Sequence, residues 1–397
     1  MKKRQLELFS DILFSGGYDC EMYSSTFDFI KDRSAVTEEE FLKIPFSSKA
    51  DVRKHDLESR TNRLSPTFGI FGSSGTTGKK TYYKFSINDR HVFDRIASRI
   101  MHRVGAGEGD LGIICAPVLD GVMAHTMMWE YTAIGAGYMN CPIPSPENFM
   151  SVLNAAHPTV VSGLPSTLDF SLSPDFTVPD DSSIRLLLSG GNFFSNSKRR
   201  ALEQKWGLDW YDFLGVSEIF GPIMGECREK HGLHYDSELF IVEIIDPVTL
   251  QPVEEAGVIG MLVITPLWNK GSPLVRYWTD DFAYRITEKC PCGEEGDRIY
   301  VCGRKNDYLR LGDRYIFPRD LEEIVFAHSG DCRAYVDLTE DGEITVYSRG
   351  LSDEGRAAMT GLFDRPLRFN SDYDFDAVRA HKPSLFSDRI KAHFNGD

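Results

Sequence analysis

The chain has 397 residues, of which 42% are hydrophobic and 12% aromatic, so it can bury a sizeable core. At roughly 150 residues per domain, this length predicts two or three folding units. The net charge of -15 opposes binding to phosphate backbones and anionic lipid, which makes nucleic acid and membranes poor partner candidates. Glu7 and Asp11 interrupt the opening segment and no run of roughly 18 apolar residues is present, so we expect a cytoplasmic protein.

The first 60 residues have the polar, amphipathic pattern of helices, with a stop at Pro45. Small hydroxylated residues and glycine at 66–78 predict a loop, and the polar stretch 88–104 predicts a helix after it. Apolar and amphipathic segments then alternate, which predicts an α/β body with buried parallel strands. In that body we expect strands at 111–119, 158–165 and 183–191, and helices at 122–137 and 197–207.

The pattern changes in the last part of the chain. Residues 240–265 are strand-rich and hairpin-like, which predicts an antiparallel subdomain. Beyond Gly303 and Arg304, short strands and short helices predict a small α+β unit. We therefore predict an α/β fold with a layered N-terminal body at 1–303, including the β-rich subdomain, and a C-terminal unit at 304–397.

The segment GSSGTTGKK, residues 72–80, combines three glycines, four hydroxyl-bearing residues and two lysines. Glycines let backbone N–H groups converge on an anion, and hydroxyls and lysine complete the shell. The segment is not the loop of the nucleotide hydrolases, because Ser73 stands five residues before Gly78 and Lys80 replaces the magnesium-binding hydroxyl. A flexible surface turn is the alternative reading of a glycine- and serine-rich stretch.

At these residues the sequence resembles the adenylate-forming superfamily of acyl- and aryl-CoA synthetases. The mobile phosphate loop of that family corresponds to Ser73, Ser74, Gly75, Thr76, Thr77, Gly78 and Lys79. Further matches follow in the family's order. Residues 212–218 resemble the segment whose hydroxyl contacts phosphate and whose glutamate holds Mg²⁺, which implies these roles for Ser217 and Glu218, with Leu214 at a tyrosine position.

Three more segments carry the resemblance. The turn that lies along adenine in the family is matched by Gly190, Gly191 and Asn192, the last in place of an acid. The segment RYWTDD implies that Asp281 binds both ribose hydroxyls, and GRKND resembles the hinge before the lid, which gives Arg304 a ribose and phosphate contact. The segment SLFSDRIKA, 384–392, places Lys391 at the catalytic lysine on four matching residues.

Taken alone, each of these residues could have an ordinary structural role. Ser217 could cap a helix, Glu218 could be solvated, and Asp281 could form a surface ion pair. Only their shared order favours a site. His125 and the cluster Met123, Met127, Met128 and Trp129 are more typical of a core than of a ligand pocket.

Cys290 and Cys292 form a tight knuckle, and 63 residues earlier Cys227 is followed by His231 and His234. Four nitrogen and sulfur ligands from two segments make a tetrahedral structural zinc plausible. The branch that this sequence resembles, phenylacetate-CoA ligase, carries such a metal at these places. We predict the set Cys227, His234, Cys290 and Cys292, with His231 in reserve; the alternative is buried cysteines beside exposed histidines.

The resemblance implies an ATP-dependent ligase, with ATP and Mg²⁺ as cofactors, that converts an aromatic carboxylic acid into an acyl-adenylate. Such transfer depends on positioning and on neutralising charge at the oxygens, roles that suit the loop, Glu218 and Lys391. CoA or a carrier thiol would accept the acyl group in a second step, and a homodimer is left open.

Two features set this chain apart from the family pattern. The C-terminal unit has only 94 residues, and together with the altered motifs it resembles atypical branch members from phenazine-type antibiotic pathways in secondary metabolism. The rival reading is a catalytically degenerate fold that binds an aryl acid or a nucleotide. Leu214, Asn192 and Asn306 favour that rival. The residues that oppose it are Ser217, Glu218, Asp281 and, if it is the catalytic lysine, Lys391.

Overall fold

The structure is a computed structural model that describes residues 3–63, 65–73, 80–116, 122–141, 145–165, 168–169, 176–179, 181–331, 333–373, 375 and 385–395. The N-terminal segment forms helical turns that pack an aromatic cluster around Phe9 and Phe41. Capping boxes at Thr37 and Ser48 fix where two of the helices begin. These elements are α1 (Lys3–Phe14), η1 (Glu21–Tyr23), α2 (Glu38–Lys43) and α3 (Lys49–Lys54).

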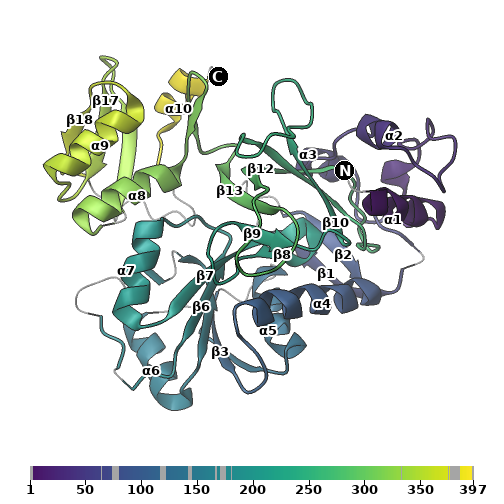
Figure 1. Ribbon diagram of the computed structural model, residues 1–397, viewed down its shortest axis with the longest axis horizontal. Coiled ribbons are helices and arrows are strands. Elements are labelled where there is room, and N and C mark those ends of the chain that lie inside the picture. The colour runs from purple at the N-terminus through teal and green to yellow at the C-terminus, as the bar shows by residue number, and fades with distance from the viewer. Residues whose placement is uncertain are drawn as a thin grey trace.

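One 11-stranded sheet forms the centre of the body, in the order β10-β11-β12-β13-β9-β8-β7-β6-β5-β3-β4 (Figure 1). Its parallel half matches the predicted alternation of strands and helices. These strands are β3 (Leu111–Cys115), β4 (Gly137–Asn140), β5 (Val160–Gly163), β6 (Leu186–Gly190) and β7 (Asp209–Val216).

Helices cover both faces of the parallel half, as its fully buried strands require. Along β6, Leu186 and Leu188 face one helical layer while Leu187 faces the other, because side chains alternate along a strand. The first layer holds α4 (Ile87–Arg103) and α5 (Val122–Ala133), and the second holds α6 (Pro146–Ala156) and α7 (Asn196–Trp206).

The antiparallel strands continue the same sheet. The predicted antiparallel subdomain is present within the body, and β8 pairs with β7 and so joins it to the parallel half. The hairpin expected at 240–265 is present as β10 and β11. The strands of this half are β8 (Gly221–Gly225), β9 (Leu233–Tyr235), β10 (Phe240–Ile245), β11 (Gly260–Pro266), β12 (Tyr277–Ile286) and β13 (Arg298–Arg304).

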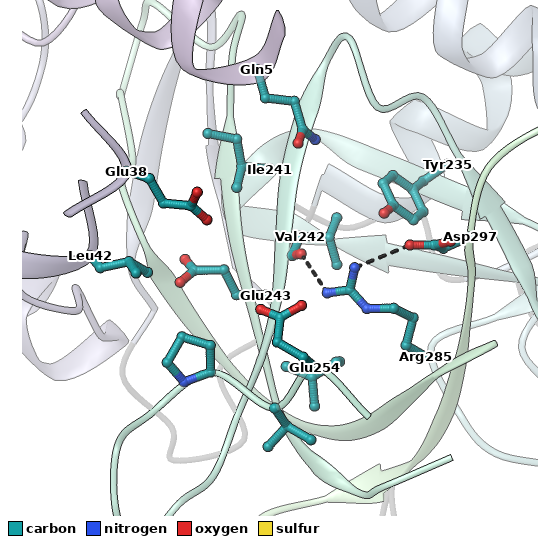
Figure 2. Close-up of a pocket in the computed structure, with 13 residues that line it drawn as sticks. Gln5, Glu38, Leu42, Tyr235, Ile241, Val242, Glu243, Glu254, Arg285 and Asp297 are labelled. Atoms are coloured by element: carbon teal, nitrogen blue, oxygen red, sulfur yellow. Dashed lines mark hydrogen bonds and ion pairs between the residues drawn. The ribbon is translucent and has the colours of Figure 1, made fainter. Parts of the chain in front are cut away.

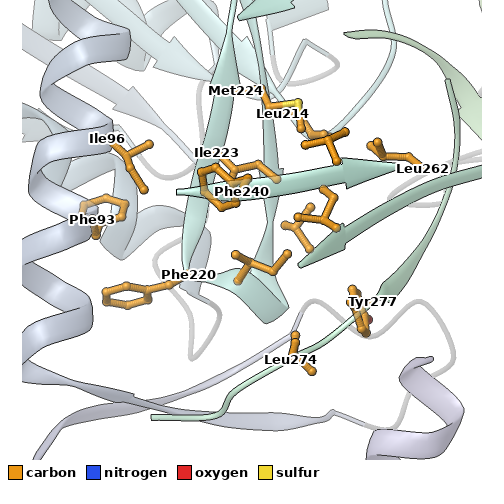
Figure 3. Packing of buried hydrophobic residues seen from close by; sticks show 14 of the residues in the cluster. Phe93, Ile96, Leu214, Phe220, Ile223, Met224, Phe240, Leu262, Leu274 and Tyr277 are labelled. Atoms are coloured by element: carbon orange, nitrogen blue, oxygen red, sulfur yellow. The ribbon is translucent and has the colours of Figure 1, made fainter. Parts of the chain in front are cut away.

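A buried apolar cluster connects the two halves of the sheet with helix α4 (Figure 3). Phe93 and Ile96 of α4 pack toward Ile223 of β8, while Phe240 and Leu262 come from the antiparallel half. At roughly 1.5–3 kcal/mol for each fully buried large side chain, this cluster is a main reason why the body is one unit.

The loop predicted at 66–78 is wrong in its first half. Strand β1 (Thr67–Gly72) pairs antiparallel with β2 (Tyr82–Ser86), and Phe71 lies against Phe85 with ring centroids 6.3 Å apart. The glycine- and serine-rich composition concealed a strand whose partner lies ten residues further along the chain. Residues 74–79 lie outside the described part of the chain.

After Arg304 the chain leaves the large sheet and builds a unit with its own core, including Leu321, Val336 and Met359. This confirms the predicted class, an α/β body with a small α+β C-terminal unit, which lies beside α7 in Figure 1. Its elements are β14 (Leu309–Leu311), β15 (Arg314–Ile316), α8 (Pro318–Ser329), β16 (Ala334–Leu338), β17 (Ile344–Ser348), α9 (Asp353–Phe363), β18 (Arg368–Asn370) and α10 (Asp388–Asn395). Within the described residues, no helix is both long and apolar enough to cross a bilayer.

Candidate functional site

The carboxyl ends of β6 and β7 bring two of the predicted motifs side by side. Gly190, the last residue of β6, pairs with Phe213 of β7, and a Cβ on Gly190 would lie 2.4 Å from the Phe213 carbonyl oxygen. Gly191 follows with φ +82°, a conformation that other residues rarely adopt, and Asn192 comes next. Only glycine fits this turn, which lies where ligands bind in sheets of this kind.

The glutamate of the second motif is buried and paired. Strand β7 ends at Val216, and the single turn η3 (Ser217–Ile219) follows directly, with Ser217 as its first residue. The Glu218 side chain is 9% exposed, and its Oε1 lies 3.0 Å from the Nζ of Lys49, the first residue of α3. Glu218 is therefore not a solvated surface acid.

Asp281 and Arg304 lie opposite each other in the register of β12 and β13. The Nε of Arg304 is 2.8 Å from Oδ1 of Asp281, whose side chain is 5% exposed, while the Arg304 side chain is 54% exposed. Asp280, the preceding residue, has φ +63°, a strained value for a residue other than glycine. The two groups predicted to contact ribose are thus neighbours, with the acid buried and the arginine side chain half-exposed.

These motifs meet in one place. The pKa of Arg304 is raised above its ordinary value by Asp281, and Glu218 adds to that effect. Two tyrosines belong to the same group: burial raises the pKa of Tyr277 and of Tyr83, and the charge of Glu218 raises both further. Segments separated by more than two hundred residues, from Tyr83 to Arg304, therefore share one electrostatic environment.

Sequence reasoning missed part of this group. Lys49 and Tyr83 carry no local signal, because the fold alone brings them to Glu218. Tyr277 stands within the RYWTDD segment, so its place could have been noticed. Arg276 of the same segment is structural: its guanidinium binds Glu243 and the carbonyl oxygens of Leu42 and Ile44.

The phosphate loop is described only at its first residue. Ser73 is buried, and its N–H donates to the carbonyl oxygen of Thr81 at 2.8 Å, so the two ends of the loop are tied together. Arg53 of α3 donates to the Thr81 hydroxyl at 2.8 Å. The remaining predicted loop residues, Ser74, Gly75, Thr76, Thr77, Gly78 and Lys79, lie outside the described residues.

Lys391 lies on α10, which packs against β14 and β16 within the C-terminal unit. Its Nζ is 3.0 Å from Oδ1 of Asp388, one turn earlier in the same helix. This contact does not connect it with Glu218 or Asp281, and its role as the catalytic lysine stays a prediction. Leu214, at the tyrosine position, is 9% exposed and belongs to the apolar cluster of Figure 3.

A cavity of about 250 Å³ lies elsewhere, between the N-terminal helices, the edge strand β10 and residues of β12 (Figure 2). Arg285 stands at its centre, bonded to the carbonyl oxygen of Val242 and to Asp297. None of the residues that line the cavity belongs to a predicted motif. Four of them carry carboxylates, namely Glu38, Glu243, Glu254 and Asp297. Such an acidic cavity does not suit a triphosphate.

The four predicted metal ligands come together. Their ligand atoms all lie within 4.8 Å of one another, with 3.7 Å between the sulfurs of Cys227 and Cys290 and 3.5 Å between the Cys292 sulfur and Nε2 of His234. Tetrahedral zinc, with bonds of about 2.3 Å to sulfur and about 2.0 Å to nitrogen, separates its ligands by about 3.5–3.8 Å. The Cys227–Cys290 and Cys292–His234 distances therefore fit a zinc ion, and His234 rather than the reserve His231 belongs to the cluster.

The surroundings of the cluster also fit a metal. His234 is 2% exposed, which excludes the alternative of exposed histidines, and its Nδ1 faces Glu294 at 3.6 Å. A carboxylate behind the far ring nitrogen is the usual support of a zinc-bound histidine. Glu294 is itself held by Arg103 at 2.7 and 2.8 Å. Burial and the charge of Arg103 lower the pKa of His234 to about 4, so the imidazole is neutral, as metal binding requires.

Comparison with known proteins agrees with this geometry. No protein-family model matches the chain. Phenylacetate-coenzyme A ligase of Thermus thermophilus is 28% identical over 309 residues, 73% of this chain and 66% of that protein. The enzyme of the same name from Pseudomonas putida is 28% identical over 324 residues, 79% of this chain and 71% of that one. The chain is thus similar to the phenylacetate-coenzyme A ligases over about three quarters of its length.

Solved structures show the same fold. A 2-hydroxyisobutyryl-CoA ligase in its post-adenylation state superposes with a TM-score of 0.82 at 16% identity, over 97% of this chain and 88% of that one. The same ligase in its thioesterification state gives a TM-score of 0.69. The chain thus has the fold of the adenylate-forming ligases, and the alignments span about two thirds of the phenylacetate-coenzyme A ligases.

Proposed function

We propose that this protein is a ligase that uses ATP to convert an aromatic carboxylic acid into an acyl-adenylate and then transfers the acyl group to CoA. The observation that carries the proposal is the meeting of Glu218, Asp281 and Arg304 in one electrostatic environment. Three separate motifs predicted these residues, and the relatives named above are ligases that form CoA thioesters.

Each residue suits one part of the nucleotide. Asp281 offers two buried acceptor oxygens, which match the two donors of the vicinal ribose diol, and Arg304 can turn from Asp281 toward a phosphate because it is half-exposed. Lys49 and Arg304 balance Glu218 and Asp281 in the described group. A triphosphate therefore needs further positive charge, which Lys79 of the phosphate loop would supply.

Mg²⁺ fits this site through Glu218. The ion commonly binds one or two protein carboxylates and takes its other ligands from phosphates and water. When bound, it would neutralise charge on the phosphate oxygens that the reaction displaces. Lys49, now paired with Glu218, would then be available to a phosphate oxygen, and Ser217 beside it offers a hydroxyl.

We place the aromatic acid beside helix α5. Met123 lies near the Gly191 turn, with its sulfur 3.8 Å from a Cβ built on that glycine. Met127 is a core residue as predicted, but His125 and Trp129 are only half-buried and lie 5.5 Å from the Phe71 ring. An aryl ring is a natural partner for such a half-exposed aromatic group.

ATP–pyrophosphate exchange over a panel of aryl acids tests the proposal. We expect acid-dependent exchange that requires Mg²⁺, and loss of exchange in Glu218→Gln, while the exposed control Glu238→Gln keeps it. Tight binding of an acid with no exchange for any acid would favour the degenerate binding protein instead. Thioester formation with CoA but not with a carrier thiol would identify the acceptor. A place in a phenazine-type pathway of secondary metabolism stays a prediction, as does a homodimer.

We also propose that the Cys227, His234, Cys290 and Cys292 cluster holds a structural zinc. Four protein ligands leave no open position for a substrate, which separates this site from catalytic zinc centres.

A further inference from the structure

Helix α8 of the C-terminal unit meets helix α7 of the body at the beginning of α7 (Figure 1). There the backbone N–H of Ser195 donates to Oε1 of Glu322 at 2.7 Å, and that of Ser197 donates to Oε2 of Glu323 at 3.0 Å. The Ser197 hydroxyl donates to the other oxygen of Glu323 at 2.6 Å. The carboxylates thus satisfy donors that a helix leaves without partners where it begins.

We propose that Glu322 and Glu323 form a latch that holds the C-terminal unit against the body by capping α7 from a different unit of the chain. The beginning of a helix carries partial positive charge, which favours carboxylates there and opposes the rise in the pKa of Glu322 that burial causes. Glu322 is 6% exposed, and Arg200 of α7 adds an ion pair with Glu323 at 3.2 Å.

The charge state of Glu323 supports a latch. Burial opposes its ionisation, but the hydrogen bonds from the hydroxyl and the N–H of Ser197 outweigh burial, so the pKa of Glu323 is lowered. Hydrogen bonds that involve a charged acceptor are stronger than neutral ones. Glu323 is thus held as a carboxylate by the contacts that it makes with the body.

An apolar contact and a second charge pair accompany the latch. Phe193, which lies between the glycine turn and α7, packs against the core of the C-terminal unit. Arg319 of α8 has its Nη2 3.9 Å from Oδ2 of Asp212 on β7, and its guanidinium stacks 5.1 Å from the Tyr300 ring. The interface between the body and the C-terminal unit therefore combines the apolar contact of Phe193 with the polar contacts of Glu322 and Glu323.

The consequence of the latch for turnover rests on the proposed function. Helix α7 begins four residues after Asn192, so the latch grips the element that follows the predicted adenine turn. The arrangement described here superposes on the post-adenylation state of the solved ligase better than on its thioesterification state. A C-terminal unit that rotates between the two steps has to release the α7 N–H groups, and loss of the latch would favour the later arrangement.

Hydrogen exchange measured on the full chain tests the latch without any assay of activity. In Glu322→Ala/Glu323→Ala, we expect the amides of residues 193–200 to exchange about tenfold faster, because charge-assisted hydrogen bonds to two of them are lost. The exposed residue Glu340 lies on the same C-terminal unit, and Glu340→Ala should leave these amides unchanged. Amides of β16 and β17 report whether each variant is folded.

Unchanged exchange at 193–200 in a folded double variant would overturn the latch, whether or not the protein is a ligase. If the double variant does not fold, Glu323→Ala alone gives the same test at Ser197, because the Glu323 side chain is 37% exposed. Faster exchange in a chain that has no ligase activity would support the latch and remove the proposed function.

If the protein has ligase activity, the rates of the two half-reactions distinguish a latch from a contact that only stabilises the fold. We expect pyrophosphate exchange to slow about tenfold in the double variant, because a smaller fraction of the molecules has the C-terminal unit against α7. Transfer of preformed adenylate to CoA should not be slowed. Equal slowing of both steps would overturn the conformational role.

Discussion

The Cys227, His234, Cys290 and Cys292 cluster holds its four ligand atoms within 4.8 Å of one another. In the proposed nucleotide group, by contrast, Glu218 is paired with Lys49 and Asp281 with Arg304. Three of the four residues of the cluster are buried, Cys292 is partly exposed, and its histidine is almost fully buried. Arg304 in the nucleotide group is half-exposed and can change partner. The ligand atoms of the proposed zinc site are thus already gathered in one place, whereas each acid of the nucleotide group is paired with a lysine or an arginine.

The strongest test of this contrast removes a metal ligand. Cys290→Ser should lower zinc content well below one equivalent and reduce the free energy of unfolding by about 3 kcal/mol or more, because structural zinc binding contributes directly to folding. Metal analysis and denaturant unfolding measure both effects. Cys20→Ser, at a half-buried thiol outside the cluster, should change neither. Wild-type protein purified with well under one equivalent of zinc would contradict the prediction.

The matching test on the nucleotide side should affect activity and spare the fold. Asp281→Asn removes the charge of the predicted diol acceptor, so we expect kcat/KM for ATP to fall about 100-fold, corresponding to about 3 kcal/mol of lost charge-assisted bonding. Pyrophosphate exchange measures the loss. The free energy of unfolding should change by less than about 1 kcal/mol, because the partner Arg304 is half-exposed and becomes solvated. A large loss of stability with unchanged activity would place Asp281 in the scaffold instead.

Glu130 on α5 is a buried acid that forms no ion pair with any of the described residues, so its charged form destabilises the fold. Its side chain is 3% exposed, Oε1 has no hydrogen-bond partner among the described residues, and burial raises its pKa to about 8. The folded chain therefore binds more protons than the unfolded chain between the ordinary carboxyl pKa and about 8. Stability should fall as pH rises through that window.

Unfolding experiments at several pH values measure this effect. Between pH 5 and 7 we expect the free energy of unfolding to drop by about 2 kcal/mol relative to Glu130→Gln, which keeps the shape of the side chain and cannot ionise. The same pH profile in both proteins would show that Glu130 finds a partner or reaches water.

The smallest effect is expected at Lys49, which the fold brings to Glu218. Lys49→Ala should reduce kcat/KM for ATP about tenfold, because one positive charge leaves the phosphate side of the site. Lys43→Ala removes a similar lysine, paired with Glu39 on the neighbouring helix α2, and should have no effect. Activity restored in part by Lys49→Arg would support an electrostatic role, whereas equal activity of Lys49→Ala and wild type would exclude it.

The predictions that succeeded depended on local spacing. The knuckle of Cys290 and Cys292 and the alternation that gives β6 and α7 can be read within a few residues of chain. His234 was separated from His231 by resemblance, and the structure agrees because β9 directs His234 into the cluster.

The features that the sequence did not predict depend on pairing over long distances. Strand β1 exists because β2 supplies its hydrogen bonds, and the antiparallel half joins the sheet because β8 pairs with β7. Nothing near Lys49 in the sequence points to Glu218, and nothing near Glu323 points to Ser197. Such contacts are set by the register of whole elements, which composition and periodicity do not encode.

Strand β9 has only three residues, yet it fills the place between β8 and β13 and so completes the path from Glu218 to Asp281 across the sheet. His234 pairs with Gly225 on one side and Arg298 on the other, and its imidazole belongs to the metal cluster. A strand of three residues forms few hydrogen bonds with its neighbours β8 and β13. If the cluster holds zinc as proposed, the spacing of Glu218 and Asp281 depends on that metal, and zinc depletion should weaken nucleotide binding before the chain unfolds.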